Sequence, residues 1–263
     1  MISEKIDNNI IHFYQKVIDK TVLIRYTTDF ILKIFAMFYK KQNGNDLADS
    51  SIKMIKSIQA SLFSKINEFV NNAELTNDNI IDIRFEKDSL VPLFKLYHEN
   101  SKNDVLFNIF FKKISWDEIN EFRLFLVKFL HYYLLKYNQN TVKSNEHLDK
   151  IVSDLSYVVQ ELLQNANAYS FGQFEYELVL NHSNNKFVIT VYNFAEEKNV
   201  KVLFNIFDEL KNEENKNNLI LKYMLAEDKH LGLITSIFNY NISNFNAEYI
   251  DNKIVKIQFE MDY

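Results

Sequence analysis

Apolar residues recur at spacings of three and four along most of the chain, the pattern of amphipathic helices. It predicts helices at residues 6–18, 28–39, 47–70, 116–137, 145–169, 196–210, 219–225 and 231–240. A short helix is also expected over residues 90–97, around the single proline, Pro92. Ser115 followed by Glu118 matches a capping box, in which the serine caps a helix and the glutamate reaches back. The 116–137 helix therefore has a defined start.

Other segments alternate between apolar and polar residues or are rich in β-branched ones, as half-buried strands are. They lie at residues 80–85, 105–111, 173–180, 186–192, 247–250 and 254–260. Residues 181–185 are polar and turn the chain between two of these strands, and Asp251-Asn252 joins the last pair as a hairpin.

The polar stretch at residues 98–104 is the best linker, and it divides the chain into two expected parts. Residues 1–100 form a mainly helical N-terminal region, whose helices bury Phe30, Ile34, Phe35, Phe38, Ile55, Leu62 and Ile66 together. Residues 103–263 form a two-layer α/β sandwich with a mixed, mainly antiparallel sheet covered on one face by helices. The fold class is therefore α/β, in the α+β sense.

Composition excludes several kinds of site. The chain has no cysteine, so disulfides, thiolate zinc sites and cysteine nucleophiles are absent. Its three glycines are too few for an intact Walker loop or dinucleotide fingerprint. With 47% hydrophobic and 25% charged residues, the chain has the balance of a globular protein rather than a disordered one.

Charge and hydropathy indicate where the protein is located and which classes of partner it does not bind. The net charge is −5 and no basic patch stands out, which argues against nucleic-acid binding. The first ten residues do not resemble a signal peptide, and no window approaches the ~20 uninterrupted apolar residues of a membrane span. We expect a cytoplasmic protein that binds neither nucleic acid nor membrane.

Glu161 and Asn165 are the most informative pair of polar residues. They are four residues apart, so they share one face of the predicted 145–169 helix. An amide oxygen is a hard, neutral ligand suited to magnesium, and a carboxylate can accept a proton from a hydroxyl that attacks a phosphate. The pair therefore fits a magnesium-phosphate site, although a solvated helix face can carry the same spacing.

The segment around this pair, ELLQNANAYS, resembles the N-box of the GHKL (Bergerat-fold) ATPases. That superfamily includes histidine kinases, anti-sigma-factor serine kinases and topoisomerase ATPase domains, and the leading glutamate is closer to the last two. The resemblance covers roughly residues 103–263 and implies ATP and Mg²⁺ as cofactors. It makes Asn165 the magnesium ligand and Glu161 the general base.

The other boxes of that superfamily match less well. Asn193 occupies the place of the adenine-binding aspartate, and Ala195 and Glu197 stand where glycines belong. In the second glycine box, KHLGLITSI, Gly232 and Leu233 are retained, while His230 replaces the first glycine. The resemblance then implies that Asn165, Asn193, Lys229, Gly232 and Leu233 contact the nucleotide.

These observations predict a signalling regulator that binds a protein partner and, through its ATPase-like domain, Mg-ATP. One alternative is an active anti-sigma-type serine kinase, favoured by Glu161 and Asn165. Another is a non-catalytic pseudo-ATPase that serves as a docking scaffold, favoured by the altered glycine boxes. The N-terminal helices could also form a homodimer, since three short helices make a small core on their own.

Overall fold

The computed structural model describes most of the 263 residues. The described ranges are 10–16, 23–43, 49–72, 79–86, 93–98, 105–112, 115–137, 144–171, 175–183, 185–212, 216–225 and 231–263.

The described residues contain one eight-stranded sheet, in the order β3-β2-β1-β4-β5-β6-β8-β7. Each neighbouring pair of these strands is antiparallel. The strands are β1 (Ile10–Lys16), β2 (Asn79–Glu86), β3 (Leu93–His98), β4 (Val105–Lys112), β5 (Glu175–Ser183), β6 (Lys186–Phe194), β7 (Ile242–Ile250) and β8 (Ile254–Asp262).

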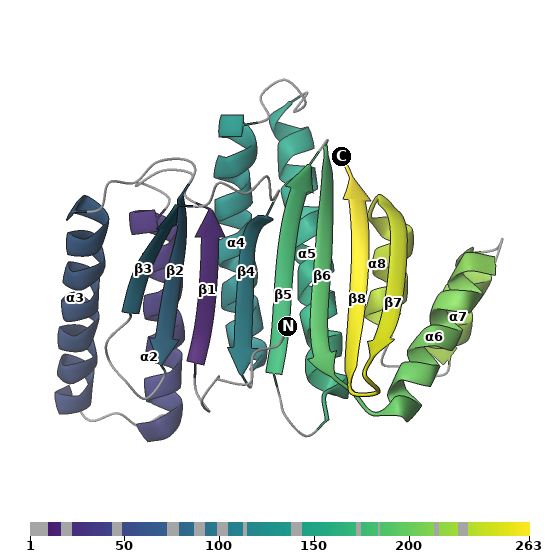
Figure 1. The fold of residues 1–263 in the computed structure, drawn as a ribbon, viewed down its shortest axis with the longest axis horizontal. Coiled ribbons are helices and arrows are strands. Elements are labelled where there is room, and N and C mark those ends of the chain that lie inside the picture. The colour runs from purple at the N-terminus through teal and green to yellow at the C-terminus, as the bar shows by residue number, and fades with distance from the viewer. Residues whose placement is uncertain are drawn as a thin grey trace.

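Helices form the second layer. In Figure 1, α2, α4, α5 and α8 lie behind the strands, while α3 stands at one end of the sheet and α6 and α7 at the other. The helical elements are a π-helical turn η1 (Leu23–Thr27), α2 (Thr28–Asn43), α3 (Asp49–Asn72), α4 (Trp116–Tyr137), α5 (Asn145–Tyr169), α6 (Glu197–Asn212), α7 (Lys216–Leu225) and α8 (Leu231–Asn239). The predicted fold class, a two-layer α/β sandwich with a mainly antiparallel sheet, is confirmed, although the described strand pairs are all antiparallel and the sheet is not mixed as predicted.

The strand content of the first hundred residues corrects the sequence analysis. Residues 10–16, expected within a helix, form β1, and residues 93–97, expected in a short helix, belong to β3. Both segments mix apolar and polar residues over a stretch too short to separate the two periods. Pairing decides instead, since β1 lies between β2 and β4 and β3 lies beside β2. The expected strand at residues 80–85 is confirmed as β2.

The first hundred residues share the sheet and the core of the rest of the chain. Of the predicted linker, residues 98–104, all but the first residue lie outside the described residues, and β1, before the linker, pairs with β4, after it. On the helical side, the ring of Phe30 in α2 lies 5.7 Å from that of Phe122 and 5.1 Å from that of Phe125, both in α4. Phe30, Ile34 and Ile66 are buried in the same apolar cluster as α4 and α5. The side chains of Phe35, Phe38, Ile55 and Leu62 lie outside the described residues.

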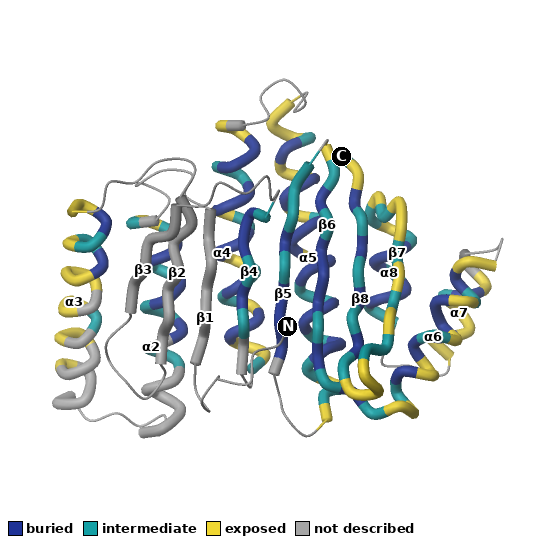
Figure 2. Tube along the Cα trace, viewed as in Figure 1, coloured by how far each residue is buried: buried dark blue, intermediate teal, exposed yellow. Residues whose placement is uncertain are grey.

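Two long helices, α4 and α5, supply the centre of this core, and both begin at a serine cap. The Ser115 backbone N–H donates to Glu118 Oε2 at 2.8 Å, and the Glu118 N–H donates to Ser115 Oγ at 3.3 Å, so the predicted capping box is confirmed. Ser144 caps α5 by accepting from the His147 N–H at 3.1 Å. Figure 2 shows α4 and α5 buried along the side that faces the sheet. The face that each helix buries is thus the one that its apolar spacing predicts.

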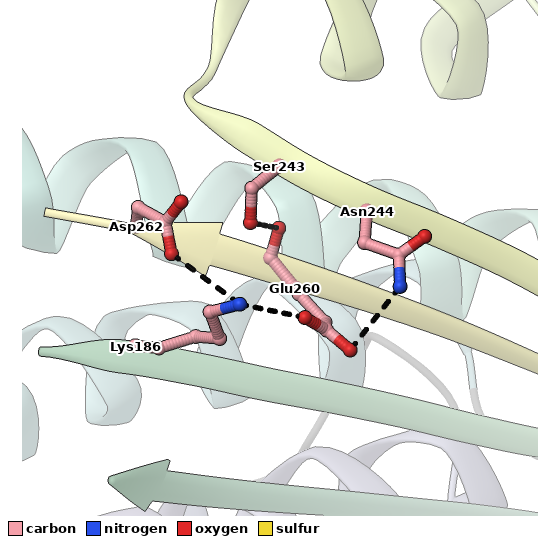
Figure 3. A network of polar contacts seen from close by, with 5 residues as sticks. All are labelled: Lys186, Ser243, Asn244, Glu260 and Asp262. Carbon is pink, nitrogen blue, oxygen red and sulfur yellow. Dashed lines mark hydrogen bonds and ion pairs between the residues drawn. The ribbon is translucent and has the colours of Figure 1, made fainter. Parts of the chain in front are cut away.

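Polar contacts bind the last strands to one another. The Lys186 Nζ of β6 lies 2.8 Å from Glu260 Oε2 and 3.7 Å from Asp262 Oδ1, both on β8, and Asn244 Nδ2 of β7 donates to Glu260 Oε1 at 3.3 Å (Figure 3). Ser243 Oγ also donates to the Glu260 carbonyl at 3.4 Å. The hydrogen bond from Lys186 is the main reason why the pKa of Glu260 is lowered. At the other end of the hairpin, Asp251 and Asn252 both have positive φ, as a two-residue turn of the twisted type requires.

Among the described residues, we find no helix that is long and apolar enough to cross a membrane.

Candidate functional site

A pocket opens at one end of the sheet, between α5, α6 and the strands β6 and β8. A water-sized probe can enter about 20 Å³ of it, roughly the space of one water molecule, within about 320 Å³ of empty space that includes open solvent. Its lining is mostly apolar, with four polar side chains. It consists of Asn165, Ala166, Tyr169, Asn193, Ala195, Asn199, Val200, Leu203, Val255 and Ile257.

The end of α5 is fixed to the end of β6, and this junction forms the pocket wall. Ser170, which follows α5, forms a β-bridge with Ala195, which follows β6. The Phe171 backbone N–H donates to the Phe194 carbonyl at 3.1 Å. The last turn of α5 is thereby held beside Asn193. The sequence analysis expected Asn165 and Asn193 to share a site, and the structure brings both into this pocket.

Asn193 is buried, with 1% of its surface exposed, and its amide has one unusual feature. The Nδ2 donates to the Phe194 carbonyl at 3.1 Å and lies 3.5 Å from Ser170 Oγ. Because the Ser170 hydroxyl gives its own hydrogen to the Ala166 carbonyl at 2.7 Å, both neighbours of Nδ2 act as acceptors. The orientation of the amide is therefore set, and Oδ1 is a buried acceptor without a hydrogen-bond partner.

An unpaired buried acceptor costs on the order of 1–3 kcal/mol, so proteins rarely leave one. Here the acceptor belongs to a side chain that lines a pocket. A ligand that donates a hydrogen bond, such as the exocyclic amino group of a nucleobase, would satisfy it. The pocket thus offers one unsatisfied acceptor within a mainly apolar lining, and its accessible space is that of about one water molecule.

Asn165 lines the same pocket, and its amide is oriented by its own helix. Its Nδ2 donates to the Glu161 carbonyl one turn earlier, at 2.8 Å. Asn165 is 7% exposed. Its role as a magnesium ligand stays a prediction. Among the described residues there is no group of three or more His, Asp or Glu side chains that could hold a metal ion.

Glu161 does not line the pocket, although it shares a helix face with Asn165. Its carboxylate lies against Gly232 in the first turn of α8. A Cβ placed on Gly232 would lie only 1.9 Å from Glu161 Oε2 and 2.7 Å from its Cδ. The retained glycine of the second box thus makes room for the Glu161 side chain. Burial raises the pKa of Glu161, while the positive end of the α8 dipole favours its charged form.

Two of the remaining predicted site residues, Gly232 and Leu233, do not line the pocket. Leu233 is completely buried in the core, and Gly232 contacts Glu161 rather than the pocket. Lys229 lies outside the described residues. The sequence analysis missed Tyr169 and Asn199 as lining residues. Tyr169 was part of the NANAYS segment, but nothing in the sequence marks Asn199, which joins the site only because α6 begins beside α5.

Glu161 makes the free energy of unfolding depend on pH, and its replacement by glutamine should remove this dependence. Because burial raises its pKa in the folded chain, the folded state binds a proton that the unfolded chain releases. Stability therefore falls as pH rises from the unfolded pKa, about 4.3, through the raised folded pKa. We therefore expect the stability of Glu161→Gln relative to the wild type to increase as pH rises through this window. Urea unfolding of both proteins at several pH values measures the difference in their free energies of unfolding. The exposed Glu146, in the first turn of α5, provides a control in Glu146→Gln. Parallel pH profiles for the wild type and Glu161→Gln would contradict the expectation.

Comparison with protein-family models and with curated proteins finds no match for the sequence. Among solved structures, the chain is similar to one from the crystal structure of the SiaB-SiaC complex from Pseudomonas aeruginosa. The two are 16% identical with a TM-score of 0.44, over 61% of this chain and 91% of that chain.

Proposed function

We propose that this protein is a signalling regulator that binds a protein partner, and that its pocket widens on binding to take a nucleobase with an exocyclic amino group. The observation that carries the ligand proposal is the buried Oδ1 of Asn193, an oriented acceptor without a partner in a pocket that is otherwise mainly apolar. The partner proposal rests on the resemblance of residues 161–170 to the N-box of the GHKL ATPases.

Replacing Asn193 with leucine tests the ligand proposal. The variant removes the acceptor, so the amino group of a bound base would be buried without a partner. We expect adenosine and ATP to bind at least about tenfold more weakly than to the wild type, measured by calorimetry with and without magnesium.

Asn181 on β5 supplies a matched control. Its Oδ1 is also buried without a partner, but Asn181 is not part of the pocket. Asn181→Leu should leave ligand affinity unchanged. The ligand proposal fails if the wild type binds no adenine compound at millimolar concentration, or if Asn193→Leu binds as well as the wild type.

The kinase alternative depends on Glu161 as the general base for transfer to a partner's serine. A raised pKa suits a general base, and burial gives Glu161 that property. Its contact with Gly232, however, holds the carboxylate against α8 instead of in the pocket. This observation favours a binding role over phosphoryl transfer.

The predicted homodimer through the N-terminal helices is tested by sedimentation of the full chain. Within one chain, Phe30 and Ile34 of α2 are already buried in the common core. A dimer would therefore use other residues of α2 or α3. A chain that stays monomeric at high micromolar concentration would contradict the dimer.

A further inference from the structure

The outer side of the helical layer carries a row of three side chains that crosses it from one helix to the next. In Figure 1, α5 lies between α4 and α8. The guanidinium carbon of Arg123, on α4, lies 4.6 Å from the ring centroid of Tyr157, on α5. The Tyr157 ring is nearly parallel to that of Tyr240, which follows α8, with 6.5 Å between the ring centroids. Because Tyr157 is 40% exposed, this row faces solvent.

Arg123 has no ionic partner among the described residues. Its side chain is half-buried, and its Nε is buried without a hydrogen-bond partner. Lys128, farther along α4, differs in this respect, since its Nζ lies 3.6 Å from Asp29 Oδ2. The charge of Arg123 is thus held on the Tyr157 ring, partly out of water and without a counter-charge, which costs free energy. A carboxylate supplied from outside the chain would compensate this charge.

An acidic side chain stands at the other end of the row. Asp154 precedes Tyr157 by three residues on α5 and forms no ion pair with a described residue. Burial raises the pKa of Asp154, although the charge of Lys150, one turn earlier, acts in the opposite direction. Burial also raises the pKa of Tyr240, and the negative charge of Asp154 adds to this effect. Asp154 therefore lies towards Tyr240, on the α8 side of the row, while Arg123 stands on its α4 side.

A cation and an anion without ion-pair partners, on opposite sides of one exposed ring, make this surface complementary to itself. In a dimer with two-fold symmetry, residue i of one copy contacts residue j of the other, and j contacts i. We infer that this face of α4, α5 and α8 binds a second copy of the chain, with Arg123 of each copy paired to the partner's Asp154. The two-fold axis then passes beside Tyr157.

The composition of the row agrees with such an interface, because tyrosine and arginine are enriched among the residues that contribute most to binding between proteins. The dimer requires neither the ligand nor the protein partner of the proposed function. It also leaves α2 and α3 outside the interface, unlike the dimer predicted from the N-terminal helices.

Sedimentation of the full chain over a range of micromolar concentrations tests the dimer. The wild type should be dimeric at high micromolar concentration. Arg123→Glu places a carboxylate opposite the partner's Asp154 at both symmetric contacts, so it should raise the dimer dissociation constant at least about tenfold. Lys65→Glu makes the same change in net charge at an exposed position of α3 and should leave the dissociation constant unchanged.

A mixture of two variants gives a test that a general loss of stability cannot imitate. Asp154→Arg by itself places two guanidinium groups opposite each other, so this variant should also be mainly monomeric. When it is mixed with Arg123→Glu, each of the two symmetric contacts joins a carboxylate to a guanidinium. A heterodimer should then form with an affinity within about tenfold of that of the wild-type dimer. Thermal unfolding of each variant alone verifies that both are folded.

The dimer at this face is excluded by a wild-type chain that stays monomeric at high micromolar concentration, or by an Arg123→Glu variant that dimerises like the wild type. A mixture of Arg123→Glu and Asp154→Arg without heterodimer would show that these two residues do not face each other. Loss of the dimer in Lys65→Glu alone would place the interface on the N-terminal helices instead. None of these results bears on the nucleobase pocket, which calorimetry tests separately.

Discussion

Phe122→Ala should lower the free energy of unfolding by about 3–5 kcal/mol, the cost of truncating a fully buried aromatic side chain. Phe122 has no exposed surface. Its ring lies 5.7 Å from that of Phe30 in α2 and 5.9 Å from that of Phe107 in β4. The substitution therefore opens a cavity at the place where the N-terminal helices, α4 and the sheet meet.

Urea unfolding followed by circular dichroism and by tyrosine and tryptophan fluorescence measures this loss. Leu124→Ala, two residues away on the exposed side of α4, is the control and should change stability by less than about 0.5 kcal/mol. If the N-terminal helices and the sheet form one cooperative unit, the two probes give a single transition in both variants. Separate transitions, or a loss below about 1 kcal/mol for Phe122→Ala, would contradict a shared core.

Asn193→Asp should destabilise the protein by about 3 kcal/mol at neutral pH, even though the new side chain has almost the same shape. The two groups around Nδ2, the Phe194 carbonyl and Ser170 Oγ, accept hydrogen bonds. An aspartate oxygen placed there would face acceptors in a buried site. A charged aspartate is thus incompatible with the present surroundings of this position.

The sign of the pH dependence follows from the same argument. Burial without a donor raises the folded pKa of the new aspartate, so its folded state holds a proton that the unfolded chain loses. The deficit should be small near pH 4 and grow as pH rises, when unfolding free energies are compared with the wild type. Asn193→Leu, which carries no charge, serves as the control and should show no such trend. A deficit that is equal at both pH values would contradict this account.

The sequence by itself determined the elements with strong local signals. The α4 and α5 spans, 116–137 and 145–169, agree with the predicted ones because each helix has a long apolar stripe and a serine cap. The final hairpin was predictable from Asp251-Asn252, since these residues tolerate positive φ. These features depend on residues that are close in sequence.

Only the tertiary structure decided the N-terminal strands. Residues 10–16 have a helix-like spacing of apolar positions, yet they form a strand because β2 and β4, some 70 and 95 residues later, provide hydrogen-bonding edges on both sides. Long-range pairing outweighs local preference in such a short segment.

The candidate site likewise combines features that the sequence predicted with features that only the tertiary structure determined. Spacing placed Glu161 and Asn165 on one helix face, and this is correct. It could not tell that Asn165 lines the pocket while the Glu161 carboxylate lies on Gly232, some 70 residues away in sequence. Nor could it show that Asn193 Oδ1 is an acceptor without a partner, because Ser170, which helps to orient the amide, meets it only after α5 and β6 have docked. Residue type and spacing set what each side chain can do, and packing sets which neighbour it meets.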